Sequence, residues 1–185
     1  MKILIISCIA VTLGCHIGSF SSVRPHARRA DCQANLKRIG AALIDYVQRH
    51  GQLPHGRNGD ASLVDVLQDP QVQKELGISS KVLQCPADTS PVRSSYMFNP
   101  TLTANDFRSD STTVVACDRQ PFHPDPSCPA DSPASVILLG SGAVTTVYLP
   151  PKARDRWATL FLEGDPRACT YSADGNLYTG DASIK

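Results

Sequence analysis

Residues 27–46 read ARRADCQANLKRIGAALIDY, and this stretch decides the fold of the chain. Apolar residues recur here and just beyond at the spacing of one helix face, with a cysteine in phase: Cys32, Leu36, Ile39, Gly40, Leu43 and Val47. Gly51, with Pro54 beyond it, predicts where the helix ends. We therefore expect an amphipathic helix with one thiol on its apolar stripe and basic residues at its start.

The composition is that of an exported protein with one core. A chain of 185 residues is long enough for one hydrophobic core and short for two. The net charge of +1 gives no overall field that would attract nucleic acid or an acidic substrate. Seven cysteines fit an oxidising compartment better than a reducing cytosol.

The N-terminus predicts export. After Lys2, residues 3–14 form an uncharged, mostly apolar run that is shorter than the about 20 residues needed to span a bilayer. Residues 12–15, TLGC, resemble a bacterial lipobox in which Thr12 replaces the usual large aliphatic residue. We expect residues 1–20 to be a signal or lipoprotein anchor, with Cys15 lipidated. The alternatives are a signal peptide cut elsewhere and an uncleaved anchor that runs on to Phe20.

The rest of the chain predicts short helices followed by antiparallel strands. Ser62 is placed to cap a short helix, and a second helix is expected from Asp69-Pro70 to Leu76-Gly77. Further expected elements are strands at 95–98, 112–117, 135–139 and 143–149, a helix over 152–163 and a hairpin within 169–178. Gly140-Ser141-Gly142 predicts the hairpin between the third and fourth strands.

This order of elements predicts an α+β fold in which the long N-terminal helix packs on a small antiparallel β-sheet. Residues 21–185 form the single expected domain. We expect the helix stripe of Leu36, Ile39, Leu43 and Val47 to pack on the strands that carry Val114, Ile137, Leu139 and Val144. Gly40 should allow close approach to the sheet, and Gln33 is assigned to the outer face.

Residues about 27–149 resemble the globular part of bacterial pilin-like proteins of the type II secretion pseudopilin class. The resemblance is carried by Arg28-Arg29, Cys32, the run NLKRIGAAL and an aromatic residue, then by Cys85-Pro86-Ala87-Asp88 and by Tyr96–Pro100. In the hairpin Gly142 is kept, whereas Ser141 stands where the family has Asp and Asp131 where it has His. The prepilin cleavage signal is missing, and no Glu precedes Glu75. The resemblance implies a pilin-like fold and a structural or interaction role.

One loop gathers residues that can bind a metal: Asp118, His123, Asp125, Cys128 and Asp131. Their spacing matches no zinc pattern, so we expect a surface loop and no metal. Asp174, Asn176 and Asp181 are potential calcium ligands, but a plain Asp-Gly turn is the favoured interpretation. The basic residues Arg24, His26, Arg28 and Arg29 would either touch anionic lipid headgroups or form a solvated helix start.

Without Cys8 and Cys15, five cysteines remain, so one should be free or pair between chains. Cys117 ends a strand and Cys128 follows across a Pro-rich loop, which favours a Cys117–Cys128 disulfide. Cys32 is expected either to meet Cys85 or to stay a buried thiol, and Cys169 is left open.

We therefore expect a non-enzymatic, exported cell-envelope protein, anchored to membrane lipid through its N-terminus on the periplasmic or extracellular side. Protein partners in the envelope are expected, and no cofactor, nucleic acid or small-molecule substrate. The alternative is a secreted enzyme or metal-binding protein with a site in the 118–131 loop.

Overall fold

One long helix, α2 (Phe20–His50), runs along the fold and dominates it. The computed structural model describes residues 20–55, 62–89, 94–119 and 134–148, together with two short strands at 170–171 and 177–178. The helix begins earlier than the sequence stretch that predicted it. It ends as predicted, since Gly51 adopts a left-handed φ of 69° and donates its N–H to the Val47 carbonyl over 2.8 Å.

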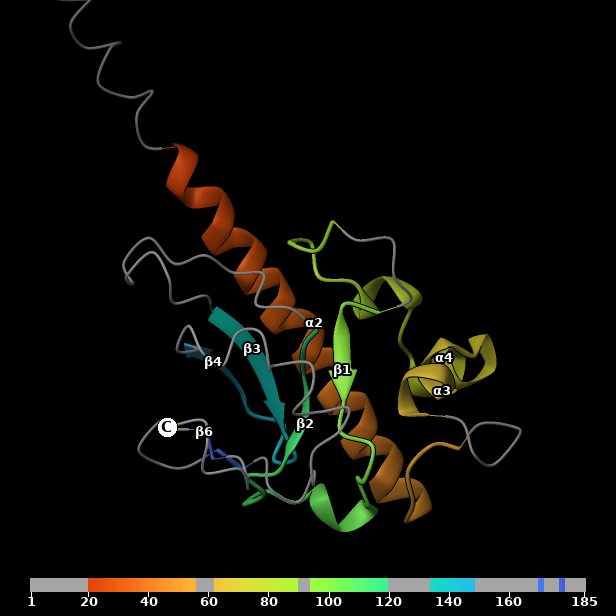
Figure 1. Cartoon of the computed structure of the whole chain (residues 1–185). Helices are drawn as coiled ribbons and strands as arrows, with labels where there is room; N and C mark the ends of the chain where they lie inside the picture. Colours follow the sequence, from red (N-terminus) through yellow and green to blue (C-terminus); the bar gives the residue numbers. More distant parts are fainter. Residues whose placement is uncertain are drawn as a thin grey trace, which may run out of the picture.

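A four-stranded antiparallel sheet lies against this helix (Figure 1). Its strands follow the chain order: β1 (Tyr96–Phe98), β2 (Val114–Asp118), β3 (Ala134–Leu139) and β4 (Val144–Tyr148). α2 packs mainly on β3, with β4 beside it. The expected α+β fold, with an N-terminal helix on a small antiparallel sheet, is therefore confirmed.

The β3–β4 hairpin turns where the sequence predicted, at Gly140-Ser141-Gly142. Gly142 has a φ of 82°, which L side chains rarely adopt. A Cβ on Gly140 would collide with the Asp106 carbonyl oxygen. Gly142 is therefore required by its own backbone conformation, and Gly140 by the neighbouring Asp106 carbonyl.

The core forms between α2 and one face of the sheet. Its fully buried helix residues are Cys32, Leu36, Ile39 and Leu43. The sheet residues of the same cluster are Tyr96, Phe98, Val115, Ala116, Val136 and Leu138.

The helix packs on strands that the sequence named, but the residues that face it are mostly other ones. Of the four that it named, Val144 packs against the helix cluster, whereas Val114, Ile137 and Leu139 are buried outside that cluster. Along β3 the cluster takes Val136 and Leu138, the alternate positions. Every residue of β2 and β3 is buried, so the apolar pattern does not distinguish one face of the sheet from the other.

The helix approaches β3 closely at Gly40, and it is hydrogen-bonded to β4 at Gln33. A Cβ on Gly40 would lie 2.7 Å from Leu138 Cδ1, which confirms that this glycine allows close approach. Gln33 is half-buried and donates its Nε2–H to Thr146 Oγ1 over 3.0 Å, so its assignment to the outer face was wrong.

Two short helices follow, α3 (Leu63–Gln68) and α4 (Pro70–Leu76) (Figure 1). α4 contacts α2, whereas α3 packs on α4 and β1. The predicted signals are confirmed: the Ser62 side chain accepts from Asp65 N, Asp69 accepts from Gln71 N, and Gly77 ends α4 with a φ of 66°. The 3₁₀ turns η1 (Ser80–Leu83) and η2 (Ala104–Asp106) flank β1.

The last described elements are β5 (Thr170–Tyr171) and β6 (Leu177–Tyr178), which pair antiparallel as the predicted hairpin requires. The helix expected over 152–163 lies outside the described residues. The division into residues 1–20 and 21–185 stays a prediction.

Candidate functional site

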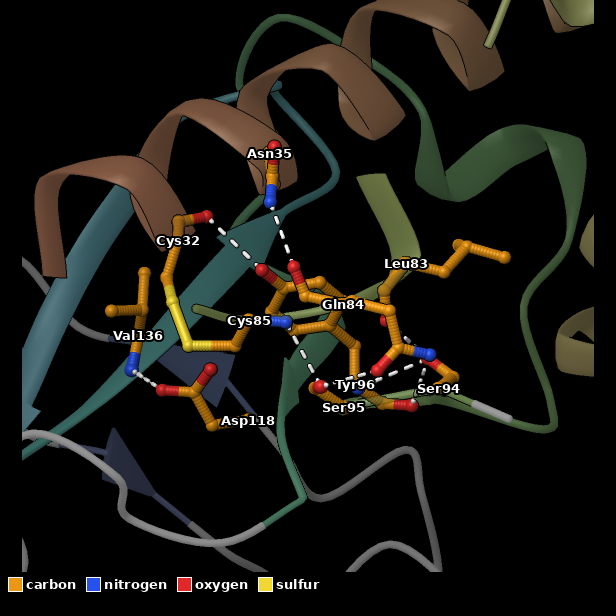
Figure 2. The surroundings of a disulfide bond; sticks show 10 residues. All are labelled: Cys32, Asn35, Leu83, Gln84, Cys85, Ser94, Ser95, Tyr96, Asp118 and Val136. Atoms are coloured by element: carbon orange, nitrogen blue, oxygen red, sulfur yellow. Dashed lines mark hydrogen bonds between the residues drawn. A yellow bond between two sulfur atoms is a disulfide. The ribbon is translucent and has the colours of Figure 1, made fainter. Parts of the chain in front are cut away.

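A disulfide joins α2 to the segment that enters β1. Cys32, on the buried stripe of the helix, bonds Cys85, and the two Cα atoms lie 5.1 Å apart (Figure 2). Cys32 is 0 % exposed and Cys85 is 2 % exposed. Of the two states that the sequence left open for Cys32, the structure thus shows the disulfide with Cys85 and not the buried thiol.

Hydrogen bonds tie the Cys85 segment to the start of β1. The Leu83 carbonyl accepts from Ser95 N over 2.9 Å and from Ser94 Oγ over 3.3 Å. The Cys85 amide donates to Ser95 Oγ over 2.9 Å. Both serines are fully buried, and these bonds satisfy backbone groups that no ladder pairs.

Polar groups of α2 reach the same segment. Asn35 Nδ2 donates to the Gln84 carbonyl over 2.9 Å, and the Tyr96 hydroxyl donates to the Cys32 carbonyl over 3.5 Å. Burial, followed by the nearby charge of Asp118, raises the pKa of Tyr96, so the phenol stays protonated. The helix and the segment are therefore held by hydrogen bonds as well as by the disulfide.

Asp118 is a buried carboxyl at the end of β2. It lies directly opposite Tyr96 in the β1–β2 pair, and its Oδ2 accepts from Val136 N over 2.7 Å (Figure 2). Burial raises its pKa to about 8, and the charge of Asp88 adds to the rise, whereas the hydrogen bond from Val136 and the nearby Ser135 hydroxyl oppose it. A neutral carboxyl at pH 7 is a structural acceptor, whereas a hard metal ion requires the carboxylate.

This position changes the interpretation of the 118–131 loop. The sequence placed Asp118 in a candidate metal loop, but its carboxyl bonds the backbone of β3. The other loop candidates, His123, Asp125, Cys128 and Asp131, lie outside the described residues. Within the described parts of the chain, no group of three or more His, Cys, Asp or Glu side chains is arranged to hold a metal ion.

The structure describes only some of the remaining predicted site residues. Cys117 is fully buried on β2, opposite Met97 on one side and Ile137 on the other. Cys15, Cys128, Cys169 and Asp174 lie outside the described residues. Lipidation of Cys15 and the Cys117–Cys128 disulfide therefore stay predictions.

The motifs that carried the family resemblance have structural roles. In Cys85-Pro86-Ala87-Asp88, the Asp88 amide closes a turn on the Cys85 carbonyl over 2.9 Å. At the end of β1, Asn99 Nδ2 donates to the Val114 carbonyl over 3.1 Å, and its Oδ1 accepts from Thr101 N over 3.0 Å.

Sequence reasoning did not single out Ser94, Ser95 or Tyr96 as a polar cluster. The available signal was a Ser-Ser pair directly before an aromatic strand.

Comparison with known proteins gives a match to a family model. A family model described as "Protein of unknown function (DUF1559)" matches residues 21–65, which cover most of α2 and the start of α3. That family is associated with type II secretion pseudopilin-like proteins. No curated protein and no solved structure matches the chain. Among the described helices, none has both the length and the apolar composition to cross a bilayer.

Proposed function

We propose that this protein is a non-enzymatic, pseudopilin-like component of the bacterial cell envelope, exported and held at the membrane by a lipidated Cys15. The observation that carries the proposal is the buried Cys32–Cys85 disulfide, because such bonds persist in oxidising compartments. The match over residues 21–65 supports the same assignment.

The polar groups near the disulfide support a structural role. Ser94, Ser95 and Asn99 are buried and bond backbone groups of neighbouring segments. A catalytic site requires polar groups that face a substrate, and these side chains instead face the fold. A protein of this kind acts through its surface, by binding partners in the envelope.

Expression of the full chain with a C-terminal tag in a bacterium tests the proposal. We expect the protein in the membrane fraction, with Cys32 and Cys85 resistant to alkylation until a reductant is added. The Cys15→Ala variant should leave the membrane fraction and keep the disulfide, whereas Cys8→Ala should behave as wild type.

Three results would contradict different parts of the proposal. Protein found in the cytosol with both thiols reduced would refute export. An intact mass that shows Cys15 without a lipid would refute the proposed lipid anchor, because that anchor consists of acyl chains attached to this residue. Turnover by the purified protein in a hydrolase panel would favour the enzyme alternative.

A further inference from the structure

The outer side of α2 carries an exposed, regularly spaced pattern. Ala27, Ala34 and Ala41 recur every seven residues, and so do Asp31, Arg38 and Asp45. All six are exposed, and they lie on the side of the helix away from Leu36, Ile39 and Leu43. A seven-residue repeat keeps one narrow stripe facing a neighbour over two or more turns.

The C-terminal part of this stripe, Arg38, Ala41 and Asp45, lines a groove of about 660 Å³. Arg38, Ala41, Ala42 and Asp45 come from α2, and the opposite wall includes Leu76 and Ile78. Leu76 is buried and Ile78 half-buried, so the groove combines small and apolar residues with one charge of each sign at its ends. Alanines at its centre leave room for the backbone of another helix.

The charges at the two ends make the groove complementary to itself. Arg38 and Asp45 are placed symmetrically about the Ala41–Ala42 peptide. A two-fold axis through that point would set a second α2 antiparallel to the first, with each Arg38 opposite Asp45 of the partner subunit. Asp45 Oδ2 already contacts Arg49 Nη2 at 2.8 Å, but the carboxylate is 64 % exposed and keeps acceptor capacity for a second cation.

We propose that the protein forms a symmetric homodimer in which two α2 helices pack antiparallel through this groove, centred on Ala41 and Ala42. Each interface then contains two Arg38–Asp45 pairs at its edges and small or apolar residues at its centre. Self-association and envelope localisation are measured separately, so failure of one leaves the other standing.

Sedimentation analysis of the full chain tests the dimer, using two single charge reversals. Arg38→Asp places two aspartates opposite each other at each edge, and Asp45→Arg places two arginines opposite each other. Each variant alone should dimerise at least about tenfold more weakly than wild type, because like charges in contact are costly. An equimolar mixture should recover dimer, since the heterodimer restores both opposite-charge pairs.

Arg108→Asp is the matched control, because it makes the same charge change at an exposed residue that does not line the groove. Circular dichroism melts of all variants confirm that each folds. A wild-type protein that stays monomeric up to about 1 mM would refute the proposal. So would single variants that dimerise as wild type, or a mixture that does not recover dimer.

Discussion

Asp118 lies directly opposite Tyr96 across the β1–β2 pair, and both side chains are fully buried. Two ionisable groups thus face each other in the core. Burial favours the neutral form of both groups, and the charge of Asp118 further raises the cost of ionising Tyr96. The stability of the domain should therefore depend on pH through Asp118.

We predict that the protein becomes less stable as the pH rises. The pKa of Asp118 is raised from 3.8 to about 8 in the folded state, so the unfolded chain loses this proton first. Between about pH 4 and pH 8 the folded state binds more protons than the unfolded state, and the free energy of unfolding falls. Outside this window Asp118 adds no further pH dependence.

Urea denaturation of Asp118→Asn over this range is the measurement. The amide oxygen can still accept from Val136 N, and the amide carries no charge, so the variant should lose the decline and exceed wild type above pH 8. Asp110→Asn, at an exposed position, is the control and should follow the wild-type curve. A wild-type stability that increases from pH 4 to pH 8 would contradict the assignment.

Removal of the Cys32–Cys85 bond should cost about 4 kcal/mol. The estimate comes from the chain entropy of a cross-link between residues separated by 53 positions, and such losses range from about 2 to 5 kcal/mol. The Cys32→Ala/Cys85→Ala double variant, unfolded in guanidinium without reductant, measures the loss. A change below about 1 kcal/mol would mean that the bond does not constrain the unfolded chain.

Leu43→Ala should destabilise the domain by about 2–5 kcal/mol, because it leaves a cavity between α2 and the sheet. Lys37→Ala removes an exposed side chain from the same helix and should change the free energy of unfolding by less than about 0.5 kcal/mol. Thermal melts compare the two. Equal melting temperatures would show that the stripe is not buried in solution.

Gly40→Val should cost about 1–3 kcal/mol through overpacking against Leu138. Lys37→Val introduces the same β-branched residue at an exposed position of the helix and so isolates the helix-propensity part of the effect. The difference between the two variants in urea denaturation reports the steric part. No difference would mean that α2 and β3 separate easily.

The hydrogen bond between Gln33 and Thr146 should couple the two residues by about 0.5–1.5 kcal/mol. A double-mutant cycle with Gln33→Ala and Thr146→Val measures this coupling directly. Additive effects of the two changes would show that the bond is not formed in solution.

The features that the sequence predicted correctly are set by local residues. The apolar period fixes α2, Gly51 fixes its end, and Ser62 and Asp69-Pro70 fix the starts of α3 and α4. Each of these signals acts within one or two helical turns. No knowledge of the tertiary fold is needed to interpret them.

The features that the sequence left open or misassigned depend on contacts between distant segments. Cys32 and Cys85 are partners only because η1 returns the chain to α2, and spacing alone does not select one pairing among several cysteines. Val136 and Leu138 face the helix in a strand that is buried at every position and polar only at Ser135. Asp118 looked like a loop residue because a carboxylate is unusual inside a strand.

The disulfide has a further consequence for how the chain responds to proteases. Cys32 and Cys85 close a covalent ring of chain that contains α3, α4 and η1. One cut inside the ring, after the exposed Lys81 for example, leaves both pieces joined through sulfur. A cut after the exposed Arg108 lies outside the ring, and the pieces that it produces are not joined by this bond. The helix and its supporting segment thus survive a single cleavage that would otherwise detach one from the other.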